Sequence, residues 1–347
     1  MSKLKTFFAN PNLKTLLWPL VALAVILLFN LLFTKGFFHL EIRDGHLFGS
    51  LIDILNRAAP VLLLSIGMTL VIATGGIDLS VGAVIAITGA MAALLIRPDY
   101  LKGVLEYSTA PPLYAIIGIS LFVAVVCGIW NGFLVAYLKI QPIVATLILM
   151  VVGRGIAQLI TQGQILIFVH KGFQFIGGGF LCGLPFTIII VAFVLLITYL
   201  VTRKTALGLF IESVGGNPTA SYYTGINATM VKMFVYIFSA FCAGIAGLII
   251  TSDIKGADAN NAGVDMEMDA VLAVVIGGTS MNGGRYYLLG SVIGALFVQT
   301  LTTTILTRGV NPEITLVVKS LVVVTVCLMQ SSAFREKVFG KLGRGIV

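Results

Sequence analysis

Charge is scarce in this sequence. Only 10% of its 347 residues are Asp, Glu, Lys or Arg, whereas 58% are hydrophobic. Soluble domains carry about 25% charged residues. A chain with so little charge cannot cover a surface that faces water, so its solvent must be lipid. The composition therefore excludes an ordinary soluble domain and predicts an all-α integral membrane protein.

Motifs for catalysis and metal binding are also missing. The sequence has no phosphate-binding loop of the form G-x-x-x-x-G-K-[ST] and no Ser-His-Asp or Cys-His grouping. Its four cysteines form no CxxC pair, and its three histidines are far apart in sequence. We therefore expect no catalytic residue, no metal site and no cofactor bound by this chain. If it transports actively, the energy must come from another protein.

Long apolar runs fill most of the chain. A membrane-spanning helix needs about 20 mostly apolar residues. Ten runs meet or approach this length: 17–33, 58–74, 81–96, 113–137, 144–160, 186–201, 233–250, 270–276 with its flanks, 288–305 and 314–329. Several are short or interrupted by glycine, which predicts tilted, broken or partly inserted helices around a cavity. We interpret residues 1–347 as a single transmembrane domain of about ten helices.

The distribution of Lys and Arg predicts the orientation of the chain. With ten spans and both termini in the cytoplasm, most Lys and Arg residues fall on the inner side and most acidic residues on the outer side. This asymmetry explains the net charge of +8 without a nucleic acid, for which no long basic run exists. The longest cytoplasmic loop is then 202–230.

That loop has helical features of its own. Residues 206–213 predict a short amphipathic helix that ends at Gly-Gly-Asn-Pro, and a second helical run follows near 219–223. Such a helix suits a groove on a partner protein, but it could equally lie on the lipid surface. Because glycine tolerates positive φ, we expect Gly216 to turn the chain between the two helices.

Polar side chains inside or beside the spans are the candidates for a substrate pathway, because charge in lipid is costly and usually faces a cavity or a partner. Sugars are held by amides, carboxylates and an aromatic face. The predicted pathway residues are Asn56, Arg57, Trp130, Asn131, Arg154, Gln158, Asp258, Asn260 and Asn261. The alternative is that these groups satisfy one another or the backbone of broken helices. Asp78 is expected instead to cap the first turn of the next span.

Two glycine-rich segments, 75–82 and 277–284, each follow a span rich in Val and Ile and each precede another apolar run. This shared pattern could be the remnant of an internal duplication. Any glycine-rich break between two spans would look alike, so both interpretations stay open.

Four motifs carry a resemblance to a known family. They are T-R-K-T-A-L-G at 202–208 followed by G-N-P at 216–218, A-T-G-G-I-D-L-S-V-G at 73–82, V-I-G-G-T-S-M-N-G-G-R at 275–285, and N-G-F-L-V-A-Y-L-K-I-Q-P-I-V-A-T-L at 131–147. In this order and spacing they resemble the sugar permeases of the ribose/galactose/xylose family of ABC importers. Segments 52–60, 153–165 and 256–263 further resemble permeases of galactofuranose importers.

The resemblance implies a permease subunit in the bacterial inner membrane that translocates a monosaccharide, galactofuranose or a related sugar. It implies three partners: a second, different permease, a cytoplasmic ATPase with two cassettes on one chain, and a periplasmic sugar-binding protein. ATP and magnesium would sit on the ATPase. The loop 202–230 would be the coupling segment that meets it, through Arg203, Gly208, Phe210, Glu212, Gly215, Gly216 and Asn217.

Other functions stay open at this point. An importer of the same architecture could carry ribose, a signalling sugar derivative or a branched-chain amino acid. A secondary sugar transporter or channel acting alone would need an intramembrane acid for proton coupling, and only Asp53, Asp78 and Asp269 lie near span ends. A membrane scaffold that transports nothing is the remaining alternative.

Overall fold

The computed structural model describes residues 11–34, 36–43, 45–97 and 110–330, so the two predicted cytoplasmic termini, 1–10 and 331–347, lie outside the described residues. Helices dominate, as expected where the backbone must satisfy its own hydrogen bonds in lipid. They are α2 (Pro11–Phe33), α3 (Ser50–Ala73), α4 (Val81–Ile96), α5 (Leu113–Gly132), α6 (Pro142–Thr161), α7 (Lys171–Gly178), α8 (Phe186–Lys204), α9 (Leu207–Gly216), α10 (Pro218–Tyr223), α11 (Ala228–Asp253), α12 (Met266–Ile276), α13 (Leu288–Thr307) and α14 (Pro312–Gln330).

Each of the ten predicted apolar runs coincides with helix. Seven of these helices are long and apolar enough to cross a membrane: α2, α3, α5 with its π-helical extension Phe133–Tyr137, α6, α8, α11 and α13. The remaining three, α4, α12 and α14, do not meet that criterion of length and composition among the described residues. The mostly helical membrane architecture is confirmed, and the count of ten crossing helices stays a prediction.

The helices divide into a buried centre and an exposed periphery. In α3, 83% of the apolar segment is buried, whereas in α2 the figure is 11%. Helix α3 packs against α11, α12 and α13, and α4 packs against α5, α6 and α11. A helix that is apolar on all sides is stable either inside a protein or in lipid. The exposed apolar sides of α2, α5, α6 and α8 are therefore suited to lipid or to another membrane protein.

Small residues let α11 approach its neighbours closely. A Cβ at Gly247 of α11 would lie 2.7 Å from the carbonyl oxygen of Ile85 in α4. A Cβ at Gly128 of α5 would lie 2.7 Å from the Cα of Ile237 in α11. Close backbone contact of this kind is how helices associate in lipid, where the hydrophobic effect offers no advantage.

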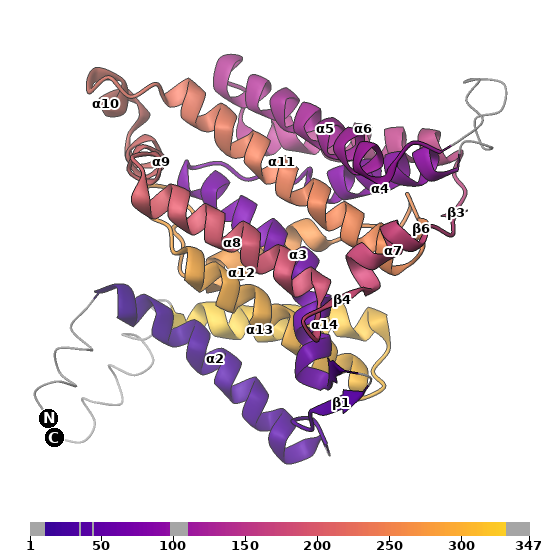
Figure 1. Cartoon of the computed structure of the whole chain (residues 1–347). Coiled ribbons are helices and arrows are strands. Elements are labelled where there is room, and N and C mark those ends of the chain that lie inside the picture. Colours follow the sequence, from indigo (N-terminus) through magenta and orange to yellow (C-terminus); the bar gives the residue numbers. More distant parts are fainter. Residues whose placement is uncertain (1–10, 35, 44, 98–109, 331–347) are drawn as a thin grey trace, which may run out of the picture.

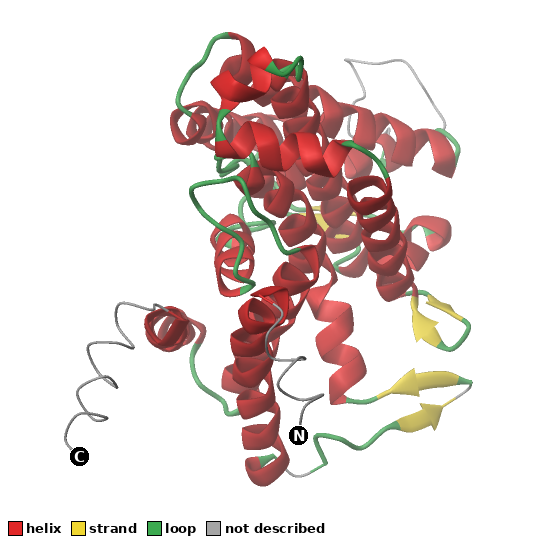
Figure 2. Cartoon of the chain, turned by 90° about the vertical axis from the view of Figure 1, so that its left-hand side faces the viewer, coloured by secondary structure: helices red, strands yellow, loops and turns green. Residues whose placement is uncertain are grey.

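Three short antiparallel strand pairs complete the fold. Strand β1 (Glu41–Arg43) pairs with β2 (His46–Phe48), β3 (Leu166–Ile167) with β6 (Gly256–Ala257), and β4 (Phe180–Leu181) with β5 (Leu184–Pro185). Figure 2 shows two of these hairpins projecting side by side from the helices. They are β1–β2 and β4–β5, joined by a hydrogen bond from the Leu47 amide to the Gly183 carbonyl, 2.9 Å.

The molecule thus has two distinct ends (Figure 1). Helices α9 and α10 lie at one end, which we call the α9 end, and the strand pairs lie towards the other, the hairpin end. A small apolar cluster at the α9 end is separate from the main core and is built around Ile211 and Val214 of α9. Helix α9 is therefore packed into the protein on one side and exposed on the other.

Candidate functional site

Five of the nine predicted pathway residues come together at the hairpin end. They are Arg154 and Gln158 of α6 and Asp258, Asn260 and Asn261 of the loop between β6 and α12, and we call this group the α6 polar cluster. The Arg154 Nη1 atom donates to the Ala259 carbonyl at 3.1 Å and to the Ala262 carbonyl at 2.6 Å.

A second contact extends the cluster towards solvent. The Gln158 Nε2 atom donates to the Asn260 Oδ1 atom at 2.8 Å. Arg154 and Gln158 are one turn apart on α6, so both reach the same loop. Arg154 satisfies backbone carbonyls, as the structural alternative expected, while the side chains of Asn260 and Asn261 stay exposed at the surface.

Asp258 stabilises the loop between β6 and α12 by accepting hydrogen bonds from its neighbours in that loop. Its Oδ1 atom accepts from the amides of Asn260 and Asn261 at 3.0 and 3.1 Å, and its Oδ2 atom accepts from the Asn261 side chain at 2.7 Å. Partial burial disfavours the charged carboxylate, but these hydrogen bonds and the nearby Arg154 charge outweigh it and lower the pKa of Asp258. The cluster therefore presents a fixed carboxylate and two exposed amides, which are groups that hydrogen-bond hydroxyls.

The other four predicted pathway residues lie elsewhere. Asn56 of α3 accepts a short hydrogen bond from the Thr187 hydroxyl of α8, and Arg57 is exposed beside it. Trp130 is 50% exposed on the outer side of α5, whereas its neighbour Asn131 is 1% exposed and faces inward. Consecutive helical residues point about 100° apart, so Trp130 and Asn131 do not form one sugar-binding surface in this conformation.

Asp78 holds a buried polar network near the α9 end. Its Oδ1 atom accepts from the Ser80 amide at 3.1 Å and the Ser80 hydroxyl at 2.7 Å, and its Oδ2 atom accepts from the Ser239 hydroxyl at 2.9 Å. Asn131 joins this network by donating to the Ser80 hydroxyl at 2.7 Å. A buried carboxylate needs several donors, and here they come from the α3–α4 loop, α5 and α11.

The prediction that Asp78 caps the first turn of the next span is wrong. Helix α4 begins at Val81 with Ser80 as its N-cap residue, and no side-chain hydrogen bond caps that turn. Asp78 lies two residues before the N-cap position and accepts from the amide of Ser80 itself. Its hydrogen bonds instead link the α3–α4 loop, α5 and α11.

At the α9 end, backbone atoms of three segments meet. A Cβ at Gly208 would overlap the carbonyl oxygen of Thr202, and a Cβ at Gly215 would overlap the carbonyl oxygen of Ala73 at the end of α3. A Cβ at Gly283 would lie 2.9 Å from the Gly215 carbonyl oxygen. These positions require glycine because the backbones are in direct contact.

The expectation for Gly216 is wrong. Gly216 is the last residue of α9, it is not among the positive-φ residues, and a Cβ placed there would meet nothing within 4 Å. The two helices are separated instead by Asn217, whose extended backbone ends α9 and whose Oδ1 atom caps α10 by accepting from Thr219 and Ala220. The close contact falls on the preceding residue, Gly215.

Among the remaining predicted coupling residues, some pack against the protein and others are exposed. The Arg203 guanidinium lies 5.7 Å from the centre of the Tyr286 ring, so it contacts the loop between α12 and α13. Glu212 is half-buried and Phe210 is exposed on α9. Only the exposed side of α9 is free to meet a partner.

Sequence reasoning missed the tyrosine pair on α10. Tyr222 and Tyr223 are 72% and 82% exposed, and Leu209 of the neighbouring α9 is 67% exposed. A hollow of about 580 Å³ next to them is lined by Tyr137 and the start of α11. Two adjacent aromatic residues in a polar loop, outside any apolar run, were the available signal, because exposed tyrosines mark protein interfaces.

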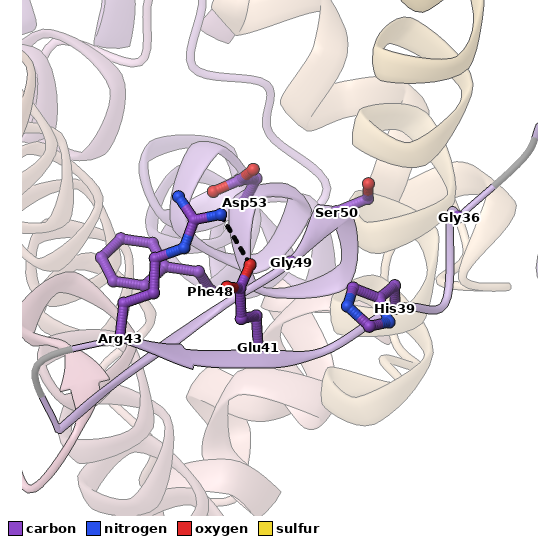
Figure 3. Close-up of a pocket in the computed structure, with 8 residues that line it drawn as sticks. All are labelled: Gly36, His39, Glu41, Arg43, Phe48, Gly49, Ser50 and Asp53. Carbon is purple, nitrogen blue, oxygen red and sulfur yellow. Dashed lines mark ion pairs between the residues drawn. The ribbon is translucent and has the colours of Figure 1, made fainter.

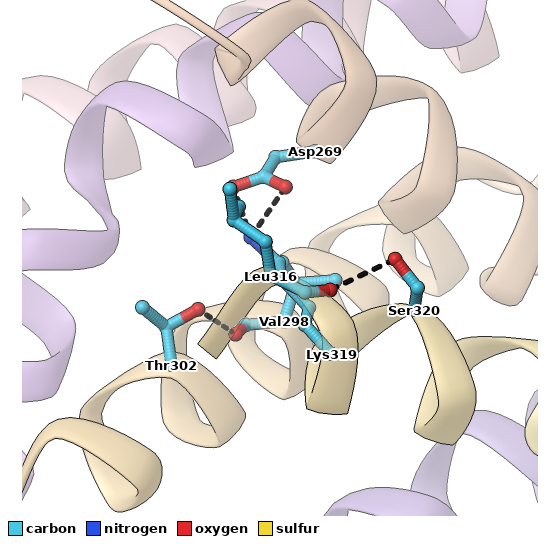
Figure 4. A network of polar contacts seen from close by, with 6 residues as sticks. All are labelled: Asp269, Val298, Thr302, Leu316, Lys319 and Ser320. Carbon is cyan, nitrogen blue, oxygen red and sulfur yellow. Dashed lines mark hydrogen bonds and ion pairs between the residues drawn. The ribbon is translucent and has the colours of Figure 1, made fainter. Parts of the chain in front are cut away.

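A largely buried ion pair between α12 and α14 was also missed. The Lys319 Nζ atom of α14 lies 2.5 and 2.6 Å from the two carboxylate oxygens of Asp269 in α12 (Figure 4). Lys319 is a charge within the apolar run 314–329, but nothing in the sequence pattern identifies its partner 50 residues away. The pair fastens the peripheral α14 to the short α12.

A charged pocket of about 320 Å³ lies at the hairpin end beside β1 (Figure 3). His39, Glu41, Arg43 and Asp53 line it, and the Arg43 Nη2 atom lies 2.7 Å from the Glu41 Oε2 atom. The hydrogen bond from Arg43 lowers the pKa of Glu41, which stays ionised at neutral pH. Mixed charges in the loop 36–49 were the signal for this pocket in the sequence.

Comparison with known proteins places these features in context. Residues 50–327 match the family model described as branched-chain amino acid transport system, permease component. The chain is 52% identical to the galactofuranose transporter permease protein of Escherichia coli (strain K12), over 94% of both chains. It is 38% identical to a fructose import permease protein of Bifidobacterium longum, over 91% of this chain and 87% of that protein. It is 34% identical to the ribose import permease protein of Haemophilus influenzae, over 80% and 84%. No solved structure matches the chain.

Proposed function

The chain belongs to the family of branched-chain amino acid transport system permease components, and from this premise we propose that it is the permease subunit of an ATP-driven sugar importer. The proposed cargo is a monosaccharide, and galactofuranose is the first candidate. The observation that carries this proposal is the 52% identity to a galactofuranose permease over nearly the whole chain. The fructose and ribose permeases among its relatives support a sugar over an amino acid.

ATP hydrolysis is assigned to a separate ATPase that holds ATP and magnesium, because this sequence has no phosphate-binding loop. We place its docking surface at the α9 end. The exposed residues Leu209, Phe210, Tyr222 and Tyr223 offer the apolar and aromatic anchors that dominate protein interfaces. The α9 end is then cytoplasmic and the hairpin end faces the periplasm, in agreement with the distribution of Lys and Arg.

The sugar is proposed to pass along the α6 polar cluster, between this chain and a second permease. Gln158 and Asn260 lie at the edge of an otherwise apolar, exposed side of α6. Polar groups at such a place are unfavourable against lipid, so they are expected to face a partner or a water-filled path. The exposed amides of Asn260 and Asn261 would bind sugar hydroxyls weakly enough for release.

A periplasmic sugar-binding protein would deliver the sugar at the hairpin end. The projecting hairpins and the charged pocket of His39, Glu41, Arg43 and Asp53 are available to it there (Figures 2 and 3). Alternating access then follows from the ATP cycle of the partner, which moves the helices around a central path.

The test is uptake into proteoliposomes that contain this chain, a second permease, the ATPase and the binding protein. We expect ATP-dependent accumulation of radiolabelled galactofuranose, reduced little by unlabelled ribose or fructose and not at all by leucine. An ATPase variant that binds but does not hydrolyse ATP serves as the control and should abolish uptake. Uptake without ATP hydrolysis would instead identify a secondary transporter, and displacement by leucine an amino acid importer.

A further inference from the structure

The end of α8 and helix α9 hold the loop between α12 and α13, residues 277–287, at two places. At the first, the Tyr286 ring lies against the Arg203 guanidinium of α8, and a Cβ at Gly208 of α9 would lie 2.7 Å from the Tyr286 hydroxyl oxygen. At the second, a Cβ at Gly283 would lie 2.9 Å from the Gly215 carbonyl oxygen of α9. The loop therefore cannot shift along α9 without breaking one of these contacts.

The same loop is fixed to the end of α3. The Gly284 amide donates to the Ala73 carbonyl at 2.9 Å, and this is the carbonyl that a Cβ at Gly215 would overlap. A Cβ at Gly283 would lie 2.9 Å from the amide nitrogen of Gly75. Gly75 and Gly283, one from each of the two glycine-rich segments identified in the sequence, thus meet beneath α9. Their contacts are made by backbone atoms, which have no rotamers to absorb a displacement.

The gripped loop directly follows α12, which connects it to residues 258–265. Helix α12 has 11 residues, a length of about 16 Å at 1.5 Å per residue. It begins shortly after the loop that Arg154 and Gln158 hold. Helix α12 is also locked to α13, because a Cβ at Gly290 would overlap the Gly277 carbonyl oxygen and one at Gly294 would overlap that of Ala273. The Lys319–Asp269 ion pair adds α14 to this unit.

We propose that Gly208 and Gly215 are positioning residues that make α9 a lever on α12. Movement imposed on α9 by the ATPase passes through the Ala73 carbonyl and the 277–287 loop into α12, and so reaches residues 258–265. The idea rests on the proposed function, since it requires an ATPase at the α9 end. It differs from coupling through the covalent α8–α9 connection alone, which would not need backbone contact at Gly215.

The experiment uses the complete complex in proteoliposomes, with Val264→Cys as a reporter. Val264 is exposed just before α12, and its labelling by a maleimide is followed by peptide mass spectrometry, so the native cysteines do not interfere. In the parent complex, which carries only the Val264→Cys change, ATP plus vanadate should change the rate of maleimide labelling at position 264 by about tenfold. Gly215→Ala should abolish this change while ATP hydrolysis continues. Gly216→Ala is the matched control, since its Cβ enters open space, and it should behave as the parent.

A second variant keeps the proposal testable if Gly215→Ala does not assemble. Tyr286→Leu removes the ring beside Arg203 and the hydroxyl beside Gly208 of α9 without forcing the backbone apart, and it should reduce the ATP-dependent change several-fold. The proposal would be overturned if the ATP-dependent change in labelling at position 264 were as large as in the parent, both in Tyr286→Leu and in any Gly215→Ala complex that assembles. So would a parent complex that transports sugar with no change at position 264. A parent complex that neither transports nor hydrolyses ATP in response to sugar would instead refute the proposed function.

Discussion

The two ends of the molecule are held together by different kinds of contact. At the hairpin end, the α6 polar cluster is built from side chains, such as Arg154 reaching the carbonyls of Ala259 and Ala262. At the α9 end, Gly208 and Gly215 bring backbone directly against backbone. Side-chain contacts can adjust to a ligand by changing rotamer, whereas backbone contacts transmit a displacement without loss. The difference suits a flexible polar passage at one end and stiff coupling at the other.

The largest expected effect comes from Gly215→Val. The added side chain would overlap the Ala73 carbonyl oxygen and displace α9 from α3, so we expect complete loss of sugar uptake at matched expression. Gly216→Val changes the neighbouring residue of the same helix, where a Cβ meets open space, and should retain most uptake. Equal loss in both variants would show that the two glycines matter for helix flexibility and not for contact.

The Lys319→Met variant tests whether the hairpin end also contains a rigid element. Removing one partner leaves Asp269 as an uncompensated, partly buried charge, which costs up to about 3–5 kcal/mol. We expect a clear fall in the thermal unfolding temperature of the purified complex. The double variant Lys319→Met/Asp269→Leu removes both charges and should recover much of that loss. If the single variant is as stable as the parent, α14 is not fastened through this pair.

Arg154→Ala should have an intermediate effect. It leaves the carbonyls of Ala259 and Ala262 without their side-chain donor, which costs about 1–3 kcal/mol, and it frees the loop to move. We expect uptake to fall by about tenfold, with partial recovery in Arg154→Lys. The neighbouring Gly155→Ala, whose Cβ has no neighbour within 4 Å, is the control. Normal uptake in Arg154→Ala would mean that loop order is unimportant for passage.

The smallest effect is expected from the exposed amides. Asn260→Leu removes the acceptor for Gln158, and Asn261→Leu removes one donor to Asp258. Each lost hydrogen bond is worth about 1 kcal/mol, so each variant should slow uptake several-fold while the complex still assembles. Co-purification with the second permease and the ATPase checks assembly. Unchanged uptake in the double variant would remove both residues from the sugar pathway.

Much of the fold could be predicted from hydrophobic runs alone. The run 81–96 coincides with α4 at both ends, and the break between α9 and α10 falls at the predicted Gly-Asn-Pro. The α6 polar cluster could also be anticipated, because Arg154 and Gln158 share a helix face and the residues 258–261 are neighbours in sequence. Local spacing was sufficient in these cases.

Contacts between distant segments could not be predicted in the same way. Hydrophobic runs do not tell which side of α5 is buried, so Trp130 and Asn131 were grouped although they face different surroundings. The glycine-rich breaks suggested a repeat, but nothing indicated that Gly75 and Gly283 touch beneath α9. The tight position was assigned to Gly216 instead of Gly215 because a helix–turn–helix was expected to turn on a glycine, whereas Asn217 makes the turn.

The most direct test is the number of sugar molecules imported per ATP hydrolysed, measured on the same proteoliposomes for two variants. The α6 polar cluster is proposed to conduct sugar, so Asn260→Leu should lower import and sugar-stimulated hydrolysis together and leave their ratio near that of the parent. The α9 contacts are proposed to couple the two processes, so Gly215→Ala should keep hydrolysis and reduce the ratio towards zero. An unchanged ratio in Gly215→Ala, or a collapsed ratio in Asn260→Leu, would contradict this division between the two ends.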